Sequence, residues 1–68
     1  MRQPTYFRIF RIDPTRGRRH TGTTKTIDEA IYSATRRAAY TGMRYEVAEG
    51  TWDGAPVVFS ADPATREG

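Results

Sequence analysis

The chain has 68 residues and no cysteine, so we expect one small domain of modest stability, with no disulfide and no thiolate zinc site. No apolar run is long enough to cross a bilayer or to act as a signal peptide, and we therefore expect a cytoplasmic protein. The net charge of +3 is unevenly distributed, because residues 1–44 carry ten basic and three acidic side chains whereas residues 45–68 carry one basic and five acidic. Ten of the eleven basic residues are arginines, which favours phosphate contacts but is equally typical of a GC-rich genome.

The first half of the chain predicts a β-hairpin. Residues 6–12, YFRIFRI, are rich in aromatic and β-branched side chains, and DPTRG at 13–17 supplies the proline and glycine of a tight turn. Residues 18–24, RRHTGTT, have almost no apolar side chain and are typical of a solvated edge strand. Because residues 6–12 form the most apolar strand, we expect that strand to lie in the centre of the sheet.

Side-chain alternation gives residues 6–12 two apolar faces. We expect Phe7 and Ile9 to pack against a helix, which leaves Tyr6, Arg8 and Phe10 on the opposite, open face of the sheet. Such a face could stack bases, dock a protein or form a homodimer; in a second interpretation, the sheet curls or the chain end covers it.

Residues 26–42, TIDEAIYSATRRAAYTG, carry a complete helix signal. Thr26 and Glu29 have the spacing of a capping box, in which each side chain accepts a hydrogen bond from the other residue's amide, and Gly42 suits the left-handed conformation that ends a helix. Four apolar residues at three- and four-residue steps predict the face that packs on the sheet: Ile27, Ile31, Ala34 and Ala38. Alanines at 30, 34, 38 and 39 indicate a close approach of helix to sheet. We expect a charge at Ile31 to unfold the domain.

Two more strands are predicted after the helix, at residues 43–47 and 56–60. A two-residue turn between them would place Val57 and Phe59 on the polar side, so we predict a bulge or a longer loop at Gly50 or Gly54. That irregularity would bring Val57 and Phe59 onto the face shared by Tyr45 and Val47.

The element order is therefore β-β-α-β-β. It predicts a small two-layer α+β domain in which one helix packs on one face of a mostly antiparallel four-stranded sheet. We expect residues 1–60 to form this compact domain and residues 61–68 to form a flexible tail.

The sequence offers little for catalysis. His20 is the only histidine and lies on the predicted edge strand without a partner, and Asp28 and Glu29 are explained by the helix N-terminus. The TRGRR segment lacks the strand-loop-helix setting of a phosphate-binding loop. We therefore expect no enzymatic activity, no metal site and no small-molecule cofactor.

An arginine cluster in the first hairpin is the leading candidate site. It comprises Arg8, Arg11, Arg16, Arg18 and Arg19, with Asp13 as the only acidic neighbour in the hairpin. Such a hairpin can bind a phosphate backbone, with Tyr6 or Phe10 available for base stacking, and the binding would weaken with salt. The alternative interpretation is that these arginines only keep an edge strand soluble.

The second hypothesis is a protein-interaction or regulatory module, of which a homodimer is one variant. The open sheet face or an edge strand would bind the partner. Two further surfaces suit such a partner. Tyr32, Arg36 and Tyr40 repeat every four residues on the outer helix face, although simple packing within the helix explains the same pattern. Trp52 is either a lid over the end of the core or an exposed anchor.

The capped helix followed by TG and YEV resembles short bacterial and phage proteins of unassigned function, through Thr26, Glu29, Ala30, Gly42, Tyr45 and Val47. This resemblance implies no site.

Overall fold

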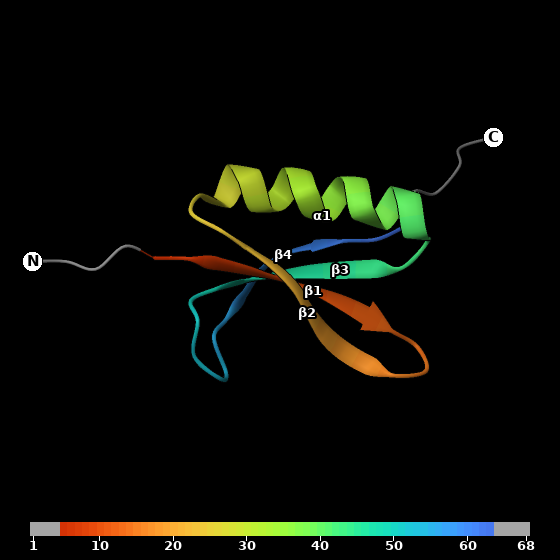
Figure 1. Ribbon diagram of the computed structural model, residues 1–68, viewed down its shortest axis with the longest axis horizontal. Helices are drawn as coiled ribbons and strands as arrows, with labels where there is room; N and C mark the ends of the chain where they lie inside the picture. Colours follow the sequence, from red (N-terminus) through yellow and green to blue (C-terminus); the bar gives the residue numbers. More distant parts are fainter. Residues whose placement is uncertain (1–4, 64–68) are drawn as a thin grey trace, which may run out of the picture.

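The computed structural model describes residues 5–63, which form four strands and one helix. The elements in chain order are β1 (Phe7–Asp13), β2 (Gly17–Thr24), α1 (Ile27–Thr41), β3 (Arg44–Glu49) and β4 (Val57–Ala61). All strand pairs are antiparallel, and the order across the sheet is β2-β1-β3-β4. The helix lies across one face of this sheet (Figure 1). The α+β architecture and the inner position of β1 are thus confirmed. No helix of this region is long and apolar enough to cross a membrane.

Both ends of α1 are capped. The Thr26 hydroxyl accepts a hydrogen bond from the Glu29 amide at 3.2 Å, and Gly42 takes the left-handed conformation with φ 75° while its amide donates to the Ala38 carbonyl at 2.9 Å. The other half of the capping box differs from the prediction, because the Glu29 carboxylate accepts from the Thr26 hydroxyl at 3.2 Å and not from the Thr26 amide. The Thr26 hydroxyl therefore accepts from the Glu29 amide and also orients the Glu29 carboxylate.

Thr26→Ala is expected to lower the free energy of unfolding by about 1 kcal/mol, because it removes the acceptor of the Glu29 amide. In a domain of this size that loss corresponds to a fall of roughly 4–8 °C in the midpoint of thermal unfolding. Thr35→Ala is the matched control, since Thr35 is exposed in the middle of the same helix and alanine has the higher helix propensity there. An equal fall in both variants would contradict the capping role of Thr26.

The helix face that packs on the sheet consists of methyl groups, since Ala30, Ala34 and Ala38 are all 0% exposed. The prediction that Ile27 shares this face is wrong, because Ile27 is 38% exposed, and Ile31 is only half-buried. A methyl group lets the helix axis approach the sheet closely, so longer side chains are displaced to the margins of the contact. A charge at the margin can reach water, and we therefore no longer expect an aspartate at position 31 to unfold the domain. Ala39, which was expected at the contact, is exposed.

The main core lies between α1 and the sheet. Its fully buried centre is formed by Ile9 of β1 and Val47 of β3, which are 1% and 0% exposed. Phe7 packs against this core from the same face as Ile9, as predicted. Ala61 is the last residue of β4 and is 6% exposed within the same core, so its assignment to a flexible tail is wrong. Residues 64–68 of that tail lie outside the described residues.

The opposite face of the sheet is only partly open. A second cluster covers part of it, in which Phe10, Ala48 and Ala55 are buried and Ile12 packs beside them. Ala55 belongs to the β3–β4 loop, and Figure 1 shows that this loop and the β1–β2 turn both bend to the side away from the helix. This loop covers part of the apolar face that one helix leaves uncovered, whereas Val57, which pairs with Ala48, stays 46% exposed.

The register of the second hairpin confirms an irregularity but not its position. Phe59 pairs with Val47 and reaches the helix face, whereas Val57 pairs with Ala48 on the opposite face. The shift lies within the strand pair, between these two positions, and the loop that closes the hairpin is long, with the Glu49 amide donating to the Pro56 carbonyl. The prediction that Val57 shares the face of Tyr45 and Val47 is therefore wrong.

Candidate functional site

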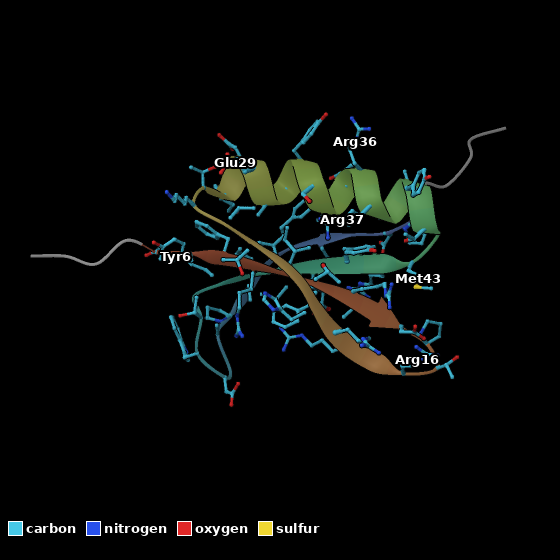
Figure 2. All side chains as sticks on the ribbon, viewed as in Figure 1. Tyr6, Arg16, Glu29, Arg36, Arg37 and Met43 are labelled. Carbon is cyan, nitrogen blue, oxygen red and sulfur yellow. The ribbon has the colours of Figure 1, made fainter. Side chains whose placement is uncertain are left out.

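The β1–β2 turn presents Arg16 to solvent (Figure 2). Asp13 Oδ1 accepts hydrogen bonds from the amides of Thr15 at 2.8 Å and Arg16 at 3.1 Å, and Gly17 closes the turn with φ 87°. These two amides, followed by the positive charges of Arg11 and Arg16, hold the pKa of the Asp13 carboxyl below its usual range. Because the lowered pKa belongs to the folded state, the stability contributed by this carboxylate is lost as the pH falls through that pKa.

Arg8 is occupied inside the protein. Its Nε donates to the Gly50 carbonyl at 3.2 Å and its Nη2 donates to the Trp52 carbonyl at 2.9 Å, so the guanidinium holds the β3–β4 loop against β1. The guanidinium also lies 5.0 Å from the centre of the Phe10 ring. Arg8 therefore has a structural role that the sequence pattern did not reveal.

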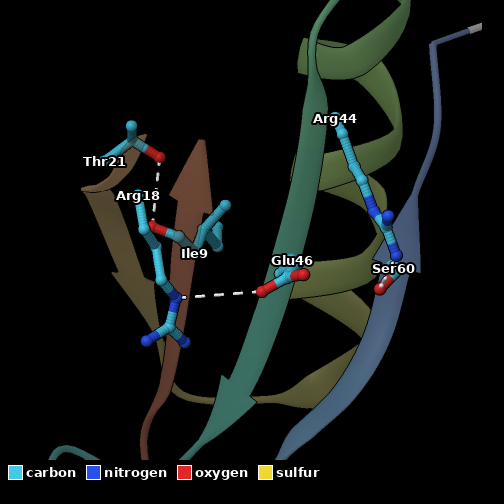
Figure 3. Close-up of polar contacts among 6 residues, drawn as sticks. All are labelled: Ile9, Arg18, Thr21, Arg44, Glu46 and Ser60. Carbon is cyan, nitrogen blue, oxygen red and sulfur yellow. Dashed lines mark hydrogen bonds and ion pairs between the residues drawn. The ribbon is translucent and has the colours of Figure 1, made fainter. Parts of the chain in front are cut away.

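Arg18 is also engaged on the face away from the helix. Its guanidinium carbon lies 3.8 Å from the centre of the Phe10 ring, and its Nε lies 3.7 Å from Glu46 Oε1 (Figure 3). His20 contacts the same ring, with 5.5 Å between centroids. Phe10 is consequently only 7% exposed, and the expectation that its ring is available to stack a base is wrong.

Arg11 and Arg19 are different, because they lie directly opposite each other on β1 and β2, on the helix side of the sheet. Two like charges at this spacing repel each other. Within residues 5–63, the carboxylates that pair with arginine belong to Glu46 and Asp62, and they pair with Arg18 and Arg44. The Nε of Arg11 is buried without a hydrogen-bond partner. Neither arginine of this pair therefore forms an ion pair within residues 5–63, and Asp13 attracts Arg11 only at longer range.

Arg37 extends from the helix towards the same region. A bulge in β2 leaves Thr21 outside the regular ladder, with its hydroxyl bonded to the Ile9 carbonyl at 3.2 Å (Figure 3). The Thr21 carbonyl accepts a hydrogen bond from Arg37 Nη1 at 3.3 Å, and the same Nη1 lies 3.8 Å from where a Cβ on Gly22 would be. We call Arg11, Arg19 and Arg37 the helix-side arginine cluster.

Arg37 was not among the candidate residues predicted from the sequence. Its position over β2 depends on the bulge at Thr21, which brings the chain of β2 beneath a helix residue sixteen positions further along. The local sequence RRHTGTT offers one indirect signal, since a glycine in a strand often marks a bulge or a close approach.

The other candidate residues are exposed and fall into two groups, one on the outer helix face and one around Gly50. Arg36 Nη1 donates to the Tyr32 hydroxyl at 2.8 Å on the outer helix face, and Tyr40, at 92% exposed, is not bonded to either of them. Trp52 is 58% exposed in the β3–β4 loop and packs on Gly50, where a Cβ would clash with the indole ring. Tyr6 precedes β1 and is 36% exposed. The Tyr6 carbonyl accepts a hydrogen bond from the Gly50 amide at 2.9 Å, so Tyr6 and Trp52 both lie at Gly50, apart from the pair of Tyr32 and Arg36 on the helix.

His20 is the one histidine of the chain. His20 is exposed, and its Nε2 lies 3.1 Å from the Thr23 hydroxyl. No group of three or more histidine, aspartate or glutamate side chains among residues 5–63 could hold a metal ion. A scan against protein-family models found no match, and searches of curated proteins and of solved structures found none either.

Proposed function

We propose that this protein is a small non-enzymatic module that binds nucleic acid through its basic first hairpin. The observation that carries the proposal is the pair of Arg11 and Arg19, which lie opposite each other on neighbouring strands and form no ion pair within residues 5–63, with Arg16 at the adjoining turn. A phosphate group between such guanidiniums replaces their repulsion by charge-assisted hydrogen bonds. A polyanion is therefore the partner that best suits this surface.

The structure divides the five hairpin arginines into two groups. Arg8 and Arg18 are held by the loop carbonyls, the Phe10 ring and Glu46, so we assign them to stability. We assign phosphate contact to Arg11, Arg16 and Arg19. Tyr6 is exposed, but it precedes β1 at the end away from the β1–β2 turn and beside the β3–β4 loop, so we assign no base stacking to it. The proposal keeps the expectation of a cytoplasmic protein of bacterial or phage origin.

Fluorescence anisotropy with labelled 20-nucleotide single strands and 20-bp duplexes tests this proposal. Three phosphate contacts predict a loss of duplex affinity of about 40-fold between 50 and 200 mM salt, and Arg19→Gln should reduce the slope of this dependence by about one unit. Arg36→Gln is the matched control, since it removes an exposed arginine charge from the outer helix face, where Arg36 donates to the Tyr32 hydroxyl, outside the hairpin. Absence of binding at low salt, or an equal effect of both variants, would refute the proposal.

The second candidate function is protein binding by strand addition to β4. This strand lies at the edge of the sheet, and Val57 and Val58 are 46% and 40% exposed on it, which is unusual for an edge that stays unpaired. Binding of a protein partner that survives moderate salt and is abolished by Val58→Lys would favour this function. The outer helix residues Tyr32, Arg36 and Tyr40, together with Trp52, are further surface residues for such a partner.

A further inference from the structure

We infer that Arg37 of the helix completes a phosphate-binding site with Arg11 and Arg19, so that the bound backbone crosses from the hairpin onto the junction between β2 and α1. This inference rests on the proposed function and adds a contact from a different element. It also sets the direction of the bound strand, which runs along the helix side of the sheet and not over the face that carries Phe10.

The spacing of the three residues suits one phosphate group or two consecutive ones. Arg11 and Arg19 are cross-strand neighbours, whose Cβ atoms are about 5 Å apart in an antiparallel pair. Arg37 reaches β2 at Thr21, two residues beyond Arg19, which corresponds to roughly 7 Å along a strand. An arginine side chain is long enough to bridge these distances, so three guanidiniums can converge on the same phosphate oxygens.

The existing contacts of Arg37 leave donors for such a ligand. Its one hydrogen bond among the described residues uses Nη1 and goes to a neutral carbonyl at 3.3 Å, a long distance for this type of bond. The side chain is exposed, and neither carboxylate that pairs with an arginine in residues 5–63 pairs with Arg37. Arg37 is therefore positioned over β2 without an ion pair to any carboxylate of residues 5–63, as a phosphate ligand requires.

Asp13 carries the carboxylate of the hairpin, and it forms no ion pair with the helix-side arginine cluster. It follows Arg11 on the same strand face, but its Oδ1 is turned towards the amides of Thr15 and Arg16. Its charge attracts Arg11 and Arg16 without forming an ion pair with either, and it offsets part of their positive charge. The helix-side arginine cluster thus keeps an excess of positive charge where β2 meets the helix.

Arg36 provides a matched control for Arg37. The two residues are adjacent in the chain and carry the same charge, yet Figure 2 shows Arg36 pointing away from the sheet and Arg37 lying between the helix and the strands. With the labelled duplex at 50 mM salt, we expect Arg37→Gln to weaken binding about tenfold and Arg36→Gln less than twofold. Thermal unfolding of each variant checks that the fold is kept.

A smaller probe reports the site directly. Inorganic pyrophosphate, titrated at low salt, should shift the side-chain Nε–Hε resonances of Arg19 and Arg37 with one common dissociation constant and leave that of Arg36 in place.

The outcomes separate this inference from the proposed function. If the wild-type protein binds neither oligonucleotide, both fail. If binding depends on Arg19 while Arg37→Gln behaves like Arg36→Gln, the proposed function stands and the site with Arg37 is refuted. If Arg37→Gln weakens duplex binding about tenfold and pyrophosphate shifts Arg37 together with Arg19, the site is supported.

Discussion

Ala34→Asp is expected to unfold the domain. Ala34 is 0% exposed at the centre of the helix face that packs on the sheet, where the adjoining side chains are apolar. A carboxylate there loses its hydration without gaining a partner, or takes up a proton, and either change costs several kcal/mol. The whole free energy of unfolding of a 68-residue domain is about 3–10 kcal/mol, so the variant should have little folded population. Far-UV circular dichroism and the dispersion of amide resonances measure this directly.

Ala39→Asp is the matched control for this prediction. It makes the same chemical change five residues later in the same helix, at a position that is exposed. The expected loss is about 1 kcal/mol, from lower helix propensity and from a negative charge near the helix C-terminus. A folded Ala34→Asp protein, or equal losses at the two positions, would contradict the assigned helix face.

The local signals of the sequence predicted the helix and its ends correctly. Thr26 and Gly42 act within one helical turn of the groups that they cap, so their effect is visible in the sequence itself. The packed face was harder to predict, because hydrophobicity favours isoleucine while the distance between helix and sheet favours alanine. That distance is a property of the assembled fold, and it excluded Ile27 from the contact.

Register shifts account for the other differences. The shift in the second hairpin separated Val57 from Phe59, and the bulge at Thr21 brought β2 under Arg37. Strand alternation predicts which face of the sheet a side chain occupies only while the hydrogen-bond ladder is regular, since one extra residue moves every following side chain to the other face. The sequence therefore predicted which segments are strands more reliably than it predicted which side chains meet.

The same limit applies to the candidate site. Composition identified five arginines in one hairpin, but it could not tell those bound within the protein from those left to meet a ligand. Arg8 is bound by carbonyls more than forty residues away in the chain, and Arg18 by Glu46 of β3. Only contacts between elements separate these two from Arg11 and Arg19.

Phe10→Ala is the second change expected to have a large effect. The Phe10 ring is the largest side chain of the cluster on the sheet face away from the helix, and Arg8, Arg18 and His20 lie against it. Removing a buried aromatic ring costs about 3–5 kcal/mol, which is comparable to the stability of the domain. Urea unfolding followed by circular dichroism should show a largely unfolded protein, or one with a much lower midpoint.

Phe10→Leu distinguishes packing from base stacking. Leucine retains most of the apolar volume but offers no aromatic face to Arg8 and Arg18, so we expect a loss of about 1–2 kcal/mol and a folded protein. Because the ring is only 7% exposed, the affinity of this variant for single-stranded oligonucleotides should match that of the wild type. Loss of single-strand affinity in a well-folded Phe10→Leu protein would instead mean that the ring becomes exposed on binding. It would also move the nucleic acid from the helix-side arginine cluster to the opposite face of the sheet.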